Sequence, residues 1–225
     1  PGGGTTLIDP LPVTFTEGQI LSAFATGDGV NQDLGVFALP AGAPGDFLPL
    51  ATYLQVAHLA PFAEDASVNV KLNGVDALTG VGYGASTGYV ELAAGQYLVE
   101  IMPVGSTTVA ISATVDLKAD DRYTAIAVGD GVNQDLDLIA LEDDLTPPAA
   151  GNAKVRMGHL APFASGMATA DIRLQDGTPV LTNVVYSAVT PTYLELPAGE
   201  YDLKVTTPGG GTTLIDPLPV TFTEG

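Results

Sequence analysis

The sequence contains no cysteine and no tryptophan, and basic residues are scarce. The lack of cysteine excludes disulfides and thiolate metal sites, so stability must come from packed cores. Seven Lys and Arg against 26 Asp and Glu give a formal net charge of −19, which excludes a general nucleic-acid binder because such a protein presents a basic face to phosphate. The same charge argues against binding to an anionic membrane. No apolar run approaches the roughly 20 residues of a membrane-spanning helix.

The residues that are present indicate a folded protein. Hydrophobic residues make up 46% of the 225 positions, too many for a disordered chain. The 27 glycines and 17 prolines are typical of short strands joined by tight turns. Acidic residues are spread along the chain, as in an acidic secreted protein or one from a saline source. The chain opens Pro1-Gly2-Gly3-Gly4, without an initiator Met or signal peptide, so we expect a mature piece or a window on something longer.

The two ends of the chain carry the same sequence. Residues 1–18, PGGGTTLIDPLPVTFTEG, recur unchanged as residues 208–225, at a spacing of 207. One explanation is a long array with this period. Another is a subunit whose matching ends let strands cross between subunits. Both describe a polymer; the remaining explanation is that the duplication is an artefact.

A second, diverged repeat lies inside that period. Its matching segments are VAHLAPFA (56–63) with MGHLAPFA (157–164), ELAAGQY (91–97) with ELPAGEY (195–201), and GDGVNQDL at 27–34 and 129–136. They predict a complete domain over residues 51–144, a linker over 145–151 and the N-terminal part of a second domain over 152–225. Residues 1–50 would then hold the C-terminal part of that second domain, with Val109–Leu117 matching Leu214–Phe222 and Tyr123–Val128 matching Ile20–Ala25.

The local patterns are those of β-strands. Residues 67–72 alternate polar and apolar, and Asn73-Gly74 follows as a hairpin signal. In the second unit, residues 171–174 lead into Asp176-Gly177 in the same way. We count about seven strands per unit with turn signals roughly every 8–12 residues. The prediction is an all-β protein of two tandem immunoglobulin-like Greek-key β-sandwich domains, the second circularly permuted or split across the chain ends. The Pro147-Pro148 pair makes the linker a semi-rigid spacer.

The duplicated segment is a candidate assembly strand. Pro10 and Pro12 lie two residues apart, so their missing N–H groups fall on one side and the strand should sit at a sheet edge. The predicted apolar face comprises Leu7, Leu11, Val13 and Phe15, and in the second copy Leu214, Leu218, Val220 and Phe222. One interpretation is an ordinary edge strand whose prolines block aggregation. The other is a donated strand that completes a neighbour's sandwich by β-augmentation.

Several of these motifs resemble the domain of unknown function 4397 family. The resemblance rests on residues 56–61 (VAHLAP), the L-x-A-G-x-Y element at 92–97, and Leu141-Glu142-Asp143-Asp144 before Pro147-Pro148. It implies small β-sandwich modules, often in tandem, in secreted and surface proteins of bacteria and archaea. The family carries no established activity. Phe62 and Phe163 depart from the acidic residue that is usual after the proline.

Few residues suggest catalysis. His58 and His159 occupy equivalent positions, and each is either a buried histidine bonded to a closing loop or a metal ligand or general base. Residues 84–88 match the nucleophile pattern G-x-S-x-G around Ser86, but no helix is expected after it. Gly80, Gly82 and Gly84 imitate a phosphate loop and lack the same helix. We therefore interpret both glycine motifs as turns.

The duplicated octapeptide is the one candidate cation site. Asp28, Asn31 and Asp33, and in the second copy Asp130, Asn133 and Asp135, set oxygen ligands at the short spacing that calcium prefers. The distal glutamate of an EF-hand is missing, and an Asx-type turn explains the same residues. Apart from calcium we expect no cofactor.

Together these features predict a structural role. We expect a subunit or repeat unit of an extracellular filament or pilus-like surface fibre, assembled by strand complementation or by covalent tandem repetition. The alternative is a cell-surface adhesive or carbohydrate-binding module. The expected partner is the protein itself, located outside the cell or on its surface, with no nucleic acid, no membrane span and no enzymatic activity.

Overall fold

The computed structural model describes residues 8–12, 14, 15, 17, 19–42, 45–62, 67–163 and 169–225. This part of the chain folds into several β-sheets, with one 3₁₀ turn at Pro208–Gly210 and no α-helix, which confirms the all-β prediction. No helix within it has the length and apolarity to cross a membrane. It divides into two compact units, the first within residues 1–57, 67–126 and 140–143 and the second within 58–66, 127–139 and 144–225.

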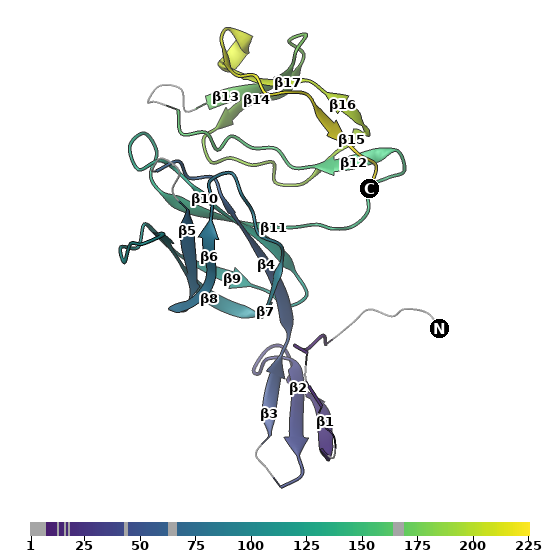
Figure 1. Ribbon diagram of the computed structural model, residues 1–225. Helices are drawn as coiled ribbons and strands as arrows, with labels where there is room; N and C mark the ends of the chain where they lie inside the picture. Colours follow the sequence, from purple (N-terminus) through teal and green to yellow (C-terminus); the bar gives the residue numbers. More distant parts are fainter. Residues whose placement is uncertain are drawn as a thin grey trace. The chain divides into compact units, whose positions relative to one another are not determined.

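The first sheet is a short antiparallel meander near the N-terminus (Figure 1). Its strands, in the order β1-β2-β3, are β1 (Leu21–Thr26), β2 (Gly35–Pro40) and β3 (Asp46–Pro49). Phe24 pairs with Phe37 across β1 and β2, and Phe37 pairs with Phe47 across β2 and β3. Among the described residues no strand pairs with the other edge of β1.

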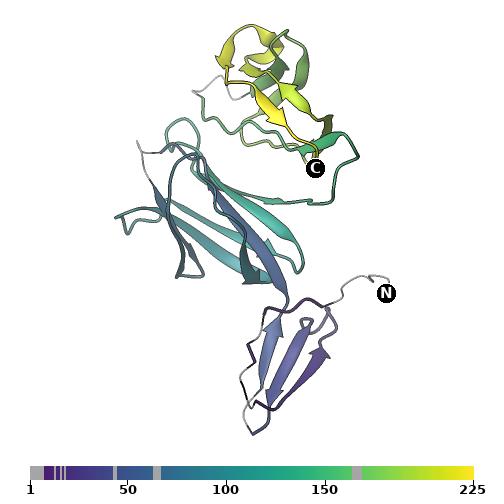
Figure 2. The same ribbon diagram turned by 45° about the vertical axis from the view of Figure 1, so that its right-hand side comes forward.

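Two four-stranded sheets follow, in the orders β11-β10-β4-β7 and β6-β5-β8-β9 (Figures 1 and 2). Their strands are β4 (Ala51–His58), β5 (Val68–Leu72), β6 (Val75–Val81), β7 (Val90–Ala93), β8 (Gly95–Pro103), β9 (Ile111–Leu117), β10 (Arg122–Val128) and β11 (Asp137–Glu142). The strand expected over residues 67–72 is β5. Its turn residues Asn73 and Gly74 both have positive φ, as the mirror-type hairpin turn requires.

The core of this part lies between the two sheets. Leu54 and Val56 from β4 and Val70 and Leu72 from β5 line one small internal space of about 10 Å³. A space of that size is close to the smallest that holds a water, so the interior is filled by side chains. The apolar residues of β5, Val68, Val70 and Leu72, are buried, and the polar residues between them are half-buried, as the alternation in the sequence predicts.

The second unit has smaller sheets, β12-β15, β14-β13-β17-β18 and β16-β19. Their strands are β12 (Asn152–Val155), β13 (Thr169–Leu174), β14 (Pro179–Val185), β15 (Leu194–Pro197), β16 (Gly199–Tyr201), β17 (Leu203–Thr206), β18 (Thr213–Ile215) and β19 (Val220–Phe222). Strand β12 matches β4 in sequence, yet within the described part of the chain it pairs with β15 alone, whereas β4 pairs with both β7 and β10.

Equivalent strands pair with one another in each of the two units. In β8 and β9, Gly95 pairs with Leu117, and Ile101 pairs with Ile111. In the second unit, Gly199 pairs with Phe222, and Val205 pairs with Ile215. The C-terminal copy of the 18-residue repeat thus occupies the sheet position that β9 occupies in the first unit.

Candidate assembly interface

The C-terminal copy of the repeat is bound along its length to the second unit. Phe222 packs on Tyr201 with ring centroids 5.0 Å apart, and Gln175 Nε2 donates a hydrogen bond to Asp216 Oδ1. Glu224 accepts a hydrogen bond of 2.9 Å from Gly151 N. The predicted apolar residues are placed unequally: Leu214 and Phe222 are half-buried, Val220 is exposed, and Leu218 is 88% exposed.

A buried carboxylate anchors the start of this copy. Asp171 Oδ2 accepts hydrogen bonds from Arg173 Nη2 at 2.7 Å and from Gly209 N at 2.9 Å, and Asp171 Oδ1 accepts one from Asn183 N at 2.8 Å. The Asp171 side chain is 2% exposed. Gly209 has a φ of 82°, a conformation that favours glycine. The glycine-rich start of the repeat therefore wraps around an ion pair.

The electrostatics of Asp171 follow from these contacts. Burial raises the pKa of this carboxyl group, but the hydrogen bonds from Asn183, Arg173 and Gly209 outweigh burial and leave the pKa below its usual value. Sequence reasoning missed this residue. The available signal was an acidic side chain in a short strand segment bounded by a turn, at the position where β5 has Asn69.

The N-terminal copy has different partners. Asp9 O accepts a hydrogen bond of 3.0 Å from Ala51 N, and Leu11 N donates one of 3.0 Å to Pro49 O. Pro10 forms an isolated bridge with Leu50. Leu11 is half-buried and Phe15 is 65% exposed, while Leu7 and Val13 lie outside the described residues. Phe15 therefore lies in solvent where its copy, Phe222, packs on an aromatic ring.

The hairpin β1-β2 is a second copy of the hairpin β10-β11. The second strands, β2 and β11, begin and end 102 positions apart. The closing hydrogen bond recurs at the same spacing: Ala41 N donates to Ile20 O at 2.9 Å, and Asp143 N donates to Arg122 O at 2.7 Å. Ile20 is therefore equivalent to Arg122, whereas the sequence alignment matches Ile20 with Tyr123, one residue further on. The two hairpins therefore share one backbone geometry.

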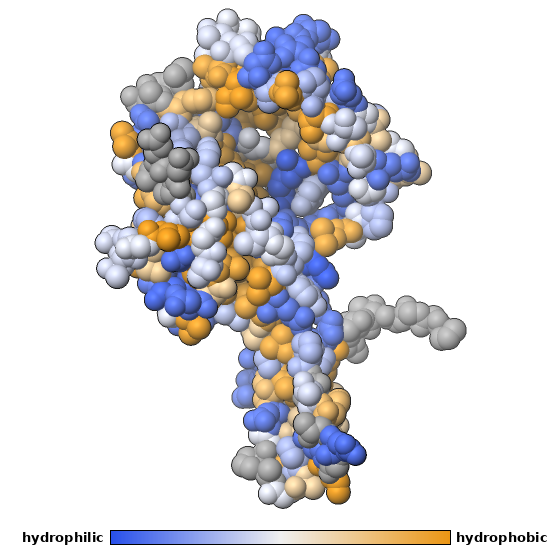
Figure 3. Space-filling model, viewed as in Figure 1, coloured by the Kyte–Doolittle hydropathy of each residue, from blue (hydrophilic) through white to orange (hydrophobic). Residues whose placement is uncertain are grey.

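Their surroundings differ. Five residues of β10 are buried, from Tyr123 to Val128 with the exception of Thr124. In β1 only Leu21 is half-buried, and Phe24, the counterpart of buried Ile126, is 53% exposed. Figure 3 shows hydrophobic patches on the three-stranded sheet, interspersed with hydrophilic residues. An exposed edge of this kind is typical of an interaction surface.

The turn of each hairpin is held by its own aspartate. Asp28 Oδ1 accepts hydrogen bonds from the amides of Val30, Asn31 and Gln32, and its Oδ2 accepts one of 2.7 Å from Asn31 Nδ2. Asp130 repeats these contacts with Val132, Asn133 and Gln134. This is the arrangement of an Asx-type turn. Both oxygens that the calcium interpretation needs from Asp28 or Asp130 are engaged by loop donors.

Acidification is expected to leave the Asp130 turn intact below the usual carboxyl range. Hydrogen bonds, that from Gln134 N first, hold the pKa of Asp130 well below 3.8. A depressed pKa in the folded state contributes stability above the unfolded value, and that contribution is lost only as the pH falls through the folded pKa. The amide chemical shifts of Val132 and Asn133, followed by NMR during an acid titration, should change with a midpoint well below pH 3.8. A midpoint near 3.8 would contradict this.

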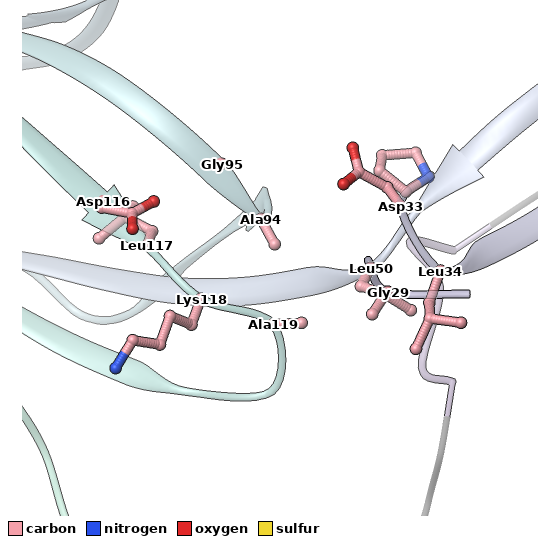
Figure 4. A pocket seen from close by; sticks show the side chains of 11 residues that line it. Gly29, Asp33, Leu34, Leu50, Ala94, Gly95, Asp116, Leu117, Lys118 and Ala119 are labelled. Atoms are coloured by element: carbon pink, nitrogen blue, oxygen red, sulfur yellow. The ribbon is translucent and has the colours of Figure 1, made fainter. Parts of the chain in front are cut away.

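A surface cleft of about 520 Å³ lies in the first unit. Figure 4 shows Asp33 and Leu34 of the β1-β2 turn on one side and Asp116 and Lys118 on the other. The lining residues include no histidine and no hydroxyl nucleophile, so the cleft lacks the groups of an acyl-transfer site.

The other candidate residues, His58, His159 and Ser86, lie in packing or strand contacts. His58 and His159 are buried, and each packs on an aromatic ring, Phe62 at 5.5 Å and Phe163 at 5.2 Å between centroids. Ser86 forms a bridge with Ala57, and no helix follows it. Over the residues that the structure describes, no group of three or more His, Asp or Glu side chains is placed to hold a metal ion.

Comparison with known proteins identifies the family. Residues 52–170, which run from β4 through the linker into β13, match the family described as Domain of unknown function (DUF4397). The chain belongs to the DUF4397 family. The match spans β4 to β11, the linker, β12 and the start of β13 of this DUF4397 protein.

Other comparisons add little. No curated protein matches the sequence. Among solved structures, the DUF4397 chain is similar to the Bacillus anthracis TIE protein, with 17% identity and a TM-score of 0.23. The similarity covers 92% of this chain and 39% of that one. At this TM-score the similarity carries no argument about fold or function.

Proposed function

We propose that this DUF4397 protein is the structural subunit or repeat unit of an extracellular filament or pilus-like surface fibre. Its units would be two tandem immunoglobulin-like Greek-key sandwiches, the second divided between the two ends of the chain. The observation that carries the proposal is the identical 18-residue repeat, whose C-terminal copy forms the edge strands β18 and β19. The role is mechanical and not enzymatic, and the partner is the protein itself.

The connection between the units suits a load-bearing chain. Lys154 Nζ contacts Asp144 Oδ2 at 2.6 Å and Thr146 Oγ1 at 2.5 Å, so both sides of the Pro147-Pro148 pair are held together. Glu195 accepts a hydrogen bond of 3.3 Å from Ala149 N within the linker. Because the linker is fastened and proline-rich, it transmits force better than a flexible tether.

Two routes lead to such a fibre. In the first, discrete chains exchange strands, and each joint is as strong as a fold because it consists of sheet hydrogen bonds and core packing. In the second, the same sequence repeats along one covalent chain. The net charge of −19 keeps either polymer from lateral aggregation at low salt.

Native material tests this proposal. Negative-stain images should show fibres, and their absence would count against the filament role. After boiling in strong denaturant, a gel band near 22.9 kDa would indicate exchanged strands, and a ladder or a very large species would indicate a covalent array. Mass spectrometry of the large species separates a peptide-linked array from a cross-linked polymer.

A further inference from the structure

We propose that the β1-β2 hairpin of one copy completes the β12-β15 sheet in the second unit of another copy, with β1 parallel to β12. This inference rests on the proposed polymer and names its joint. It follows from a template within the chain, an exposed donor, an incomplete acceptor and the order of the segments.

The template is the contact of β4 with β10. Tyr53 N donates to Asp121 O at 3.1 Å, and Leu59 N donates to Ala127 O at 2.9 Å. Both acceptors lie 68 positions after their donors, so the two strands run parallel. Gln55 Nε2 donates to Thr124 Oγ1 at 2.7 Å, which makes these two residues direct neighbours across the strands.

The donor is the β1-β2 hairpin. It reproduces the turn and the closing hydrogen bond of β10-β11, but β1 has no strand on its outer edge among the described residues. In β10 this is the edge that meets β4. Ala23 and Ala25 are exposed, while their counterparts Ala125 and Ala127 are fully buried. The hairpin thus presents a surface that its copy buries.

The acceptor is the second unit, where nothing in the described chain replaces β10. A cleft of about 310 Å³ opens over its interior, lined by Arg156, Met157, Gly158, Ile172, Leu203, Lys204, Val205 and Pro217. Leu203 and Val205 are half-buried, whereas their counterparts Val99 and Ile101 in β8 have no exposed surface. The core of this unit is therefore open at the place where a β10-like strand would lie.

The chain also leads into that place. Gly225 N donates to Asn152 O at 3.3 Å, as Asp120 N donates to Ala51 O at 2.8 Å at the entry to β10. Both residues have positive φ, 102° for Gly225 and 65° for Asp120. In the N-terminal copy of the repeat the same glycine is followed by Gln19 and then by β1. A hairpin placed at the edge of β12 therefore continues the path that the repeat begins.

The order of segments assigns the hairpin to another copy. The hairpin β10-β11 precedes the linker 145–151 and pairs with β4, a strand on its own side of the linker. By the same order, β1-β2 precedes residues 41–50 and belongs to the unit before them. In the repeat, the glycine that is Gly225 in the C-terminal copy is followed by the sequence of residues 19 onward, so the hairpin that continues this second unit belongs to the next copy of the repeat.

The template fixes the register. By the alignment of the two repeats, Gln55 of β4 corresponds to Arg156 of the acceptor, and Thr124 of β10 corresponds to Ser22 of the donor. Two residues further along the strands, Ala57 corresponds to Gly158 of the acceptor and Ile126 to Phe24 of the donor. The larger donor residue thus faces the smaller acceptor residue, so the combined volume is conserved.

Engineered cysteines test the register, since the native chain has none. Two variants of the 225-residue chain, one carrying Ser22→Cys and the other Arg156→Cys and distinguished by mass, are unfolded together in denaturant, refolded and oxidised. Neighbouring residues of paired strands lie within disulfide range, so the mixed disulfide should form between copies. The matched control pairs Ala23→Cys with Arg156→Cys, which moves the thiol to the opposite face and should lose the cross-link. A single chain with Gln55→Cys and Thr124→Cys reports the same geometry internally.

The outcomes separate two claims. An absent mixed disulfide, an equal yield from the Ala23→Cys pair, or closure of a Ser22→Cys, Arg156→Cys double variant within one chain overturns the proposed joint. If native fibres exist while the cross-link fails, the filament stands and its joint lies elsewhere. If the cross-link forms but native material shows no fibres, the joint stands and the filament role fails.

Discussion

Replacing Asp171 with alanine is expected to lower the free energy of unfolding of the second unit by about 3–5 kcal/mol. Removal of this carboxylate leaves the half-buried Arg173 guanidinium without its 2.7 Å partner and the Gly209 amide without its acceptor. Denaturant unfolding followed by circular dichroism measures the loss. Amide exchange over residues 208–225 should rise as well, because the start of the repeat is released.

The matched control is Asp202→Ala, which removes an exposed carboxylate from the same unit. It is expected to change stability by less than about 0.5 kcal/mol. An Asp171→Ala variant that unfolds like the control would show that the ion pair does not anchor the repeat.

The second large effect is the difference in stability cost between the same Val→Ala substitution made in the closed core of the first unit and in the open core of the second. Val99→Ala, at a position with no exposed surface, should cost about 2–3 kcal/mol through lost transfer energy and a residual cavity. Val205→Ala, at the half-buried position of the open core, should cost about 1 kcal/mol in dispersed chains. On assembly the cost at Val205 should rise to about that at Val99, because the hairpin of another copy covers the core.

Native-state amide exchange near each position, in dispersed and assembled samples, gives the two local stabilities. A cost at Val205 that stays unchanged on assembly would show that the second core is not completed by a partner. Val99→Ala is the control, and its cost should be the same in both samples.

Much of the first unit was accessible from the sequence. The alternation over residues 67–72 and the pair Asn73-Gly74 predicted β5 and its hairpin turn, because a half-buried strand and a mirror-type turn each leave a local signature. The GDGVNQDL duplication predicted two equivalent turns, and the structure gives Asp28 and Asp130 the same hydrogen bonds. Features set by neighbours in sequence were therefore readable.

Other features depend on contacts that a sequence pattern does not encode. The repeat was expected to form one strand, but in the second unit it divides into β18 and β19. Pro217 and Pro219 lie in the break and lack N–H groups, and Leu218 between them faces solvent. The Asp171 anchor joins residues 38 positions apart, so no local pattern announced it.

Amide hydrogen exchange across a concentration series of the 225-residue chain tests the proposed joint between copies most directly. In dilute solution, β10 should be protected on both edges, while the amides on the unpaired edges of β1 and β12 exchange freely. On assembly, β1 (Leu21–Thr26) and residues 153–157 should gain protection together and at the same concentration. Assemblies in which β1 remains unprotected, or in which β12 gains protection without it, would contradict the account.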